Sequence, residues 1–241
     1  MYQGVHNVAA TPDIPRRLPR GTHGLDPSLV AASQRTRLLE AVGRAVAEKG
    51  YAAATIDDIV RGAGVSKKTF YEHFQDKLEC FLAAYEAASD ELYEHVRAAQ
   101  DGLPAAGTGR ARGARADGTR APRVGGNAWL ERTHAGIRAY LRWLAAEPAL
   151  ARVFLIEIAA AGPEALARRE RLRDRYAERM RELQDPRAGV PAEIFHAVVA
   201  AADDLVVRRL RDGSDLLELE PILLRLQVAQ LAGPKAAAEL A

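Results

Sequence analysis

The sequence predicts an all-α protein with two helical domains. Long segments rich in Ala, Leu, Glu and Arg, which are strong helix formers, are separated by clusters of Pro and Gly. No segment shows the sustained alternation of apolar and polar residues that is typical of a strand. The 241 residues exceed the needs of one small helical module and suffice for two modest hydrophobic cores.

The composition of two segments predicts the domain boundaries. Residues 1–32 contain several prolines and glycines, so we expect a disordered arm, which carries Arg16, Arg17 and Arg20. Residues 101–126 consist mainly of Gly, Ala and Arg and are expected to form a flexible basic linker. Its arginines either touch phosphates nonspecifically or only keep the linker solvated. These segments leave one domain at 33–100, a second at 127–232 and a tail at 233–241.

Charge and cysteine content exclude several classes of protein. The formal net charge is only +2, so any contact with nucleic acid has to come from a local basic patch. The single cysteine, Cys80, excludes an internal disulfide framework and a multi-thiolate metal site. No stretch approaches the roughly 18 apolar residues that a membrane span needs. We therefore expect a soluble cytoplasmic protein that needs no metal or other cofactor and has no membrane partner.

The first helix of the N-terminal domain is expected over Ser33–Lys49. Leu39, Val42 and Val46 are spaced so that they lie on one face of that helix. Gly50 follows directly and is a suitable C-terminal cap.

A second, short helix is predicted from its capping residues. Thr55 offers an N-cap hydroxyl, and Asp57 and Asp58 place carboxylates at the positive end of the helix. The helix is expected to end near Ala63, and Gly64 then permits a tight turn.

The third helix begins after Ser66, which can cap it. Phe70 and Phe74 are four residues apart and are expected to pack inward. A fourth helix is expected from Asp76 to about Ala99, bracing the other three. The outward face of the third helix then carries Lys67, Lys68 and Tyr71.

These residues resemble the helix-turn-helix signature of the TetR family of transcriptional regulators. The match consists of Thr55–Ile56, the run AGVSKKTFYEHF at 63–74 and Asp76–Lys77, without a gap, and it covers roughly residues 34–85. The resemblance implies a three-helix helix-turn-helix DNA-binding domain, followed by a helical C-terminal ligand-binding and dimerisation domain. It further implies a repressor that leaves its palindromic operator when a small-molecule effector binds.

The resemblance also implies particular DNA contacts. The third helix would enter the major groove of double-stranded DNA, where Lys67 and Lys68 reach base edges such as guanine O6 and N7. Glu72 is expected to face solvent. Phosphate contacts would come from Thr69, Tyr71, His73 and Lys77. Thr55 would contact the DNA backbone beside the start of its helix.

The second domain is expected to contain five helices, broken at Pro148, Gly162–Pro163, Asp185–Pro186 and 212–214. Its large aromatic residues are candidates to line an effector pocket between helices, although core packing is the stronger explanation for most of them. These candidates are Trp129, Tyr140, Trp143, Phe154 and Tyr176.

The last two helices carry apolar residues on more than one stripe, which predicts burial on two sides. In a TetR-like protein the corresponding pair forms a four-helix bundle with a second copy, so a homodimer is expected. Its interface would contain Phe195, Val199, Leu205, Val206, Leu223, Leu224 and Val228.

Two other classes of function fit the sequence less well. An enzyme is not expected, because the sequence contains no Gly-rich phosphate loop, nucleophile elbow, paired metal-ligand spacing or clustered carboxylate pair. A helical interaction module would explain the amphipathic helices but not the convergence of Lys67, Tyr71, His73 and Lys77 on one surface. The long arm and the long linker depart from the family pattern and bear on how the two domains communicate.

Overall fold

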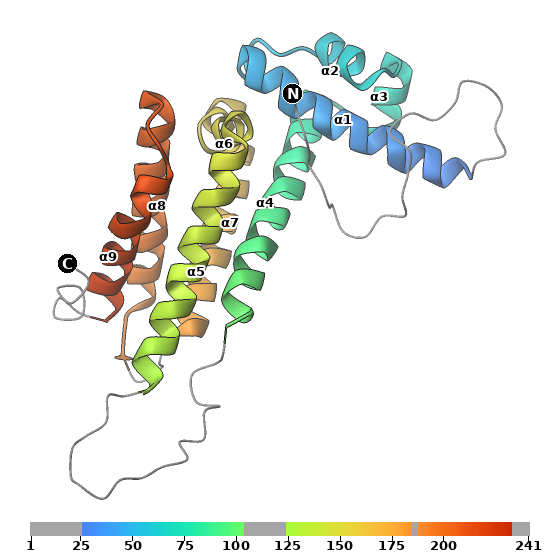
Figure 1. Cartoon of the computed structure of the whole chain (residues 1–241). Helices are drawn as coiled ribbons and strands as arrows, with labels where there is room; N and C mark the ends of the chain where they lie inside the picture. Colours follow the sequence, from blue (N-terminus) through green and yellow to red (C-terminus); the bar gives the residue numbers. More distant parts are fainter. Residues whose placement is uncertain (1–25, 104–123, 185–187, 233–241) are drawn as a thin grey trace, which may run out of the picture. The chain divides into compact units, whose positions relative to one another are not determined.

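The computed structural model describes residues 26–103, 124–184 and 188–232, and every regular element within these ranges is a helix (Figure 1). The fold class predicted from the sequence is confirmed. The chain divides into two compact units. Among the described residues, the N-terminal unit comprises 26–91 and 149–169, and the C-terminal unit comprises the rest.

The N-terminal unit begins with α1 (Pro27–Lys49), α2 (Ile56–Ala63), α3 (Lys67–His73) and the first part of α4 (Lys77–Asp101). It also contains most of α6 (Pro148–Leu155) and the short helix η1 (Glu157–Ala161). α1 packs on α2 and α3, and the largest fully buried side chains of this unit come from these helices and from α4. They include Leu38, Ile59, Phe70 and Phe81.

The first helix starts earlier than predicted. It begins at Pro27, so the residues from 27 to 32 are helical and do not belong to the expected arm. Asp26 caps the helix by accepting a hydrogen bond from the N–H of Ser28 at 2.8 Å, and Pro27 has the fixed φ that suits a first helical position. The rest of the arm lies outside the described residues.

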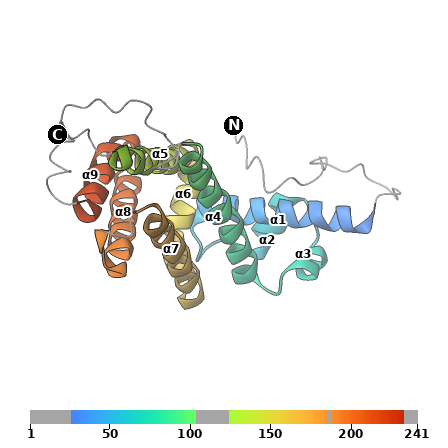
Figure 2. The ribbon, with the colours of Figure 1, turned by 90° about the horizontal axis from the view of Figure 1, so that it is seen from below.

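The C-terminal unit contains α5 (Val124–Ala146), most of α7 (Pro163–Leu183), α8 (Ala192–Asp212), η3 (Leu217–Leu219) and α9 (Glu220–Leu231). α9 packs against both α5 and α8, and α8 lies beside α9 in both views of the ribbon (Figure 2). The predicted helix breaks at Pro148, Pro163 and 212–214 are observed. Residues 104–123 of the expected linker lie outside the described residues, while α5 already begins within its last three.

The end of α4 is held inside the C-terminal unit by arginines from two helices. Asp101 accepts hydrogen bonds from Arg132 of α5 at 2.8 Å and from Arg179 of α7 at 2.5 Å. Arg179 also donates to the side-chain oxygen of the buried Gln100 at 3.0 Å. Charge-assisted bonds of this kind fix the relative positions of the three helices in this unit. Within the described ranges, no helix is long and apolar enough to cross a membrane.

Candidate nucleic-acid interface

The start of α2 is fixed by a complete capping box. The hydroxyl of Thr55 accepts from the N–H of Asp58 at 3.2 Å, and the carboxylate of Asp58 accepts from the N–H of Thr55 at 3.1 Å. Lys49 at the end of α1 donates to the same carboxylate at 2.6 Å. The bonds from Lys49 and Thr55 lower the pKa of Asp58 to about 2. Asp58 therefore joins the end of α1 to the start of α2.

The turn between α2 and α3 is set by one glycine and two capping groups. Gly64 has a φ of 65°, in the left-handed region that favours glycine. Arg37 of α1 donates to the carbonyl of Ala63 at 2.9 Å, which satisfies a C-terminal carbonyl of α2. The hydroxyl of Ser66 accepts from the N–H of Thr69 at 3.0 Å and caps α3. The predicted turn at Gly64 and the predicted N-caps at Thr55 and Ser66 are confirmed.

The two faces of α3 differ as predicted. Phe70 is 0% exposed and Phe74 is buried beside it, with 5.9 Å between the ring centroids. Tyr71 is 57% exposed and the side chain of Lys68 is 88% exposed. Because the buried rings anchor one face, the opposite face presents cationic and hydroxyl groups in a fixed orientation. Such a helix is of the kind that enters a major groove.

The two lysines of this face differ in their partners. Lys67 forms an ion pair of 2.7 Å with Asp57 of α2, which raises the pKa of Lys67. Lys68 lies 3.8 Å from Glu72, one helical turn along, and Glu72 faces solvent as expected. An exposed pair at 3.8 Å is weak, so the ammonium of Lys68 stays more available to a new partner than that of Lys67.

The remaining predicted contact residues already hold local roles. The hydroxyl of Thr69 lies 3.0 Å from that of Ser66, and the His73 ring lies 3.3 Å from the amide oxygen of Gln34. Lys77, at the start of α4, donates to the carbonyls of Tyr51 at 2.7 Å and Ala54 at 2.9 Å. An ammonium has three N–H groups, so one remains for a further acceptor.

Sequence reasoning missed the basic residues of α1 and α2 that build this region. Arg37, Arg44 and Lys49 bind groups of α2, and the side chain of Arg61 is 77% exposed. The signal available in the sequence was the position of Lys49 and Arg61 in the last turns of their helices, where cations are favoured.

The predicted effector residues are divided between the two units. In the C-terminal unit, Tyr176 lies 6.2 Å from Tyr140 between ring centroids and 5.3 Å from Tyr93, which was not predicted. Trp129 and Tyr176 pack against a buried cluster centred on Phe195. Phe154 instead belongs to the N-terminal unit, where its ring packs against Tyr85 at 5.8 Å. Core packing thus accounts for Phe154.

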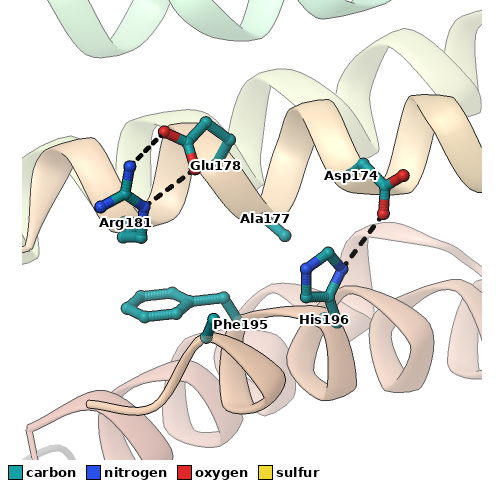
Figure 3. A pocket seen from close by; sticks show the side chains of 7 residues that line it. Asp174, Ala177, Glu178, Arg181, Phe195 and His196 are labelled. Atoms are coloured by element: carbon teal, nitrogen blue, oxygen red, sulfur yellow. Dashed lines mark hydrogen bonds and ion pairs between the residues drawn. The ribbon is translucent and has the colours of Figure 1, made fainter.

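A pocket of about 430 Å³ lies between α7 and α8 (Figure 3). Its charged side chains pair with one another: His196 lies 3.3 Å from Asp174, and Arg181 donates to Glu178 at 2.9 and 2.5 Å. None of the five predicted aromatic residues lines it. The lining residues are Asp174, Ala177, Glu178, Arg181, Ala192, Phe195 and His196.

Most of the predicted dimer residues are buried within the single chain. Five of the seven are at most 6% exposed, because α8 and α9 pack against each other and α9 packs on α5. Leu205 and Leu224 are half-buried. The prediction of a two-sided apolar pattern was correct, but these side chains form the core of the C-terminal unit. The five are Phe195, Val199, Val206, Leu223 and Val228.

The N-terminal unit matches a known family of DNA-binding domains. Residues 38–84 match the family model described as bacterial regulatory proteins, tetR family. This range contains α2, α3 and the second half of α1, together with the first turns of α4.

Two curated relatives match part of the chain. The chain is 38% identical over 81 residues to the HTH-type transcriptional activator FasR of Mycolicibacterium smegmatis, covering 34% of this chain and 37% of FasR. It is 37% identical over 73 residues to the HTH-type transcriptional regulator CymR of Pseudomonas putida, covering 27% of this chain and 36% of CymR. The chain thus spans little more than a third of the length of either relative.

Solved structures match over most of the fold. The fatty acid degradation regulator FadR of Bacillus halodurans has a TM-score of 0.63 at 16% identity, covering 81% of this chain and 98% of its own. FadR of Bacillus subtilis in complex with stearoyl-CoA has a TM-score of 0.61 at 16% identity, covering 83% and 98%. A TetR-like regulator from Rhodococcus sp. RHA1 has a TM-score of 0.59 at 19% identity, covering 90% and 100%. At these identities the likeness concerns the fold.

Proposed function

We propose that this chain, which belongs to the TetR family of bacterial regulatory proteins, represses transcription by binding a palindromic DNA operator and leaves it when a small-molecule effector binds. The observation that supports this best is the two-faced α3. Its inner face is anchored by Phe70 and Phe74, and its outer face presents Lys67, Lys68 and Tyr71.

The DNA contacts are proposed from this geometry. Lys68, whose side chain is more exposed than that of Lys67, is the best candidate to reach a guanine edge in the major groove, and Lys67 lies beside it. Phosphate contacts are proposed for Thr69, Tyr71 and His73, and for the third N–H of Lys77. A contact to the DNA backbone is proposed for Thr55 at the start of α2, where its hydroxyl and its N–H both take part in the capping box.

A homodimer is proposed because a palindromic operator requires two reading heads about 34 Å apart. With the apolar core residues of α8 and α9 already buried, its interface would use their outward faces, which include Ala197 and Ala200 on α8 and the 44% exposed Ile222 on α9. Light scattering on the free protein and on its DNA complex tests this stoichiometry.

An effector site is proposed in the C-terminal unit, whose helices carry Tyr93, Tyr140 and Tyr176 in contact. One solved structure of similar fold is in complex with stearoyl-CoA, so this ligand is a reasonable first probe. Calorimetry with stearoyl-CoA, and with coenzyme A as the control, measures whether the acyl chain is recognised.

Selection of bound duplexes from a random library by the full chain tests the DNA-binding proposal. We expect a palindromic site, and we expect Lys68→Ala to weaken binding to it by about five- to a hundredfold. Arg208→Ala, which removes an exposed cation from α8, is the matched control and should bind like the wild type. Recovery of no preferred sequence would contradict the proposal.

The direction of regulation needs a separate experiment, because the relative FasR is named an activator. A reporter driven by the selected site is expected to rise when the gene is deleted. A fall would show activation and would leave the DNA-binding proposal intact.

A further inference from the structure

The turn between α1 and α2 is held by charged side chains from two other elements. Lys77 of α4 binds the carbonyls of Tyr51 and Ala54 at 2.7 and 2.9 Å. Glu157 of η1 accepts the N–H of Tyr51 through its Oε2 atom at 2.8 Å, in a partly buried position. A cation and an anion that are distant in sequence thus fix the same residue, at its carbonyl and its N–H respectively.

The fit around this turn is close. Gly50 has a φ of 77°, and a Cβ atom at Gly50 would lie 3.2 Å from the Oε2 atom of Glu157. The Tyr51 ring lies 4.9 Å from the ring of Phe81 and 4.3 Å from the ammonium of Lys77. Any shift of Tyr51 therefore breaks contacts with several elements at once.

Glu157 belongs to a stretch of chain that is firmly packed in the N-terminal unit. Residues 149–169 lie in this unit although the sequence on both sides of them belongs to the other. Phe154 packs against Tyr85, and Arg168 forms an ion pair with Glu86. Because these contacts hold the stretch in place, the carboxylate of Glu157 is presented to the turn from a fixed support.

We propose that Glu157 is a positioning residue for DNA binding. By holding the N–H of Tyr51 it fixes the turn that leads into α2, and α2 in turn orients Lys67 on α3 through the ion pair with Asp57. Glu157 itself contacts no DNA in this scheme. The inference rests on the proposed function, since it concerns the same DNA-reading surface.

The test compares three variants of Glu157 in the full chain, with the duplex that the wild type selects as the probe. Glu157→Gln retains an oxygen that accepts the Tyr51 N–H, whereas Glu157→Ala removes it and Glu157→Asp keeps the charge on a shorter side chain. We expect Ala and Asp to lower affinity about three- to tenfold and Gln to restore most of it, given the usual net worth of an intramolecular hydrogen bond.

The salt dependence of binding separates positioning from phosphate contact. Loss of a phosphate contact lowers the slope of log K against log salt, whereas Glu157→Ala is expected to leave that slope unchanged. The Ala and Gln variants lose the same charge, so a difference between them reports the hydrogen bond. Equal affinities for Ala and Gln would overturn the proposal.

Hydrogen exchange of the free protein gives a readout that needs no DNA. The amide of Tyr51 and those of the first turn of α2 are expected to exchange faster in Glu157→Ala than in Glu157→Gln. Unchanged exchange in the Ala variant would also overturn the proposal. If the wild type selects no sequence, the proposed function fails while this measurement still decides whether Glu157 holds the turn.

Discussion

The two units of this protein use their residues differently. In the N-terminal unit, short helices begin at side chains that cap them, such as Thr55 and Ser66, and α2 ends at Gly64, whose backbone is left-handed. In the C-terminal unit, longer helices are held together along their length by apolar packing and by clusters such as Arg132, Arg179 and Asp101. Local signals therefore determine the first unit, and contacts between distant residues determine the second.

This difference bears on function. A surface that reads DNA needs side chains in fixed positions, and capped helices with one anchored face provide them. A unit that is proposed to accept an effector instead needs space between helices, and its polar groups here are satisfied mainly by one another, as in the pairs His196–Asp174 and Glu178–Arg181.

Phe70→Ala is expected to have the largest effect, a loss of stability confined to the N-terminal unit. The ring is 0% exposed and contacts Phe74 and Tyr71, so its removal leaves a cavity under α3. A loss of about 3–5 kcal/mol in the free energy of unfolding is expected. Hydrogen exchange should show lost protection over 56–74 with retained protection over 192–231.

Tyr71→Ala is the matched control, because it truncates a neighbouring ring that is mostly exposed. It should change stability by no more than about 0.5 kcal/mol. Equal destabilisation by the two variants would mean that the inner and outer faces of α3 are not distinct.

Substituting one glycine by alanine in each unit compares how closely the two units are packed, with smaller expected changes in stability. A Cβ atom at Gly136 of α5 would lie 2.4 Å from Nε2 of Gln100 and 3.0 Å from its Cδ, and Gln100 is buried and bound by Arg179. Gly136→Ala is expected to cost about 1–3 kcal/mol through overpacking. At Gly43 of α1 the nearest atom, from Leu150, is 3.4 Å away, so Gly43→Ala should be neutral or stabilising by up to about 1 kcal/mol.

Thermal melts of the two alanine variants check this pair. Each variant adds one methyl group within a helix, so the gain in helix propensity is the same at both positions. The surroundings of the methyl group therefore decide whether the substitution raises or lowers the free energy of unfolding. Destabilisation of similar size at both positions would contradict the idea that the end of α4 is the more closely packed site.

The extent to which the sequence predicts this molecule follows the same division. The bounds of α2 and α3 were predicted almost to the residue, because they are marked in the sequence by the capping residues Thr55, Gly64 and Ser66. The start of α1 was missed, since the prolines of the preceding segment outweighed the capping by Asp26. Propensity alone does not show that Pro27 stands at a first helical position, where proline is favourable.

Side chains that act between elements were harder to predict. The apolar stripe of α8 predicted burial of Phe195 and Val199 but not whether a second copy or the same chain covers them. Glu157 has no local signal at all, because its partner Tyr51 lies 106 residues away in sequence. Periodicity identifies which face is apolar, and the partner of that face is decided only by the folded chain.

The smallest expected effect concerns the cap of α2 at low pH. The Lys49 ammonium and the Thr55 cap lower the pKa of Asp58 to about 2, below its ordinary value near 3.8. A carboxylate with a lowered pKa stabilises the fold above its unfolded pKa and loses that contribution as the pH falls through its folded pKa. Stability of the N-terminal unit should therefore decline between about pH 4 and pH 2.

Denaturant titrations across this pH range, on the wild type and on Asp58→Asn, measure the contribution. The variant is expected to be the less stable protein at pH 7, and the difference between the two should shrink toward pH 2 because the wild-type carboxylate is then being protonated. A difference that stays constant with pH would show that Asp58 acts through its shape and hydrogen bonds to Thr55 rather than through its charge. In that case the link from Lys49 to α2 contributes nothing, and the start of α2 is held by its capping box alone.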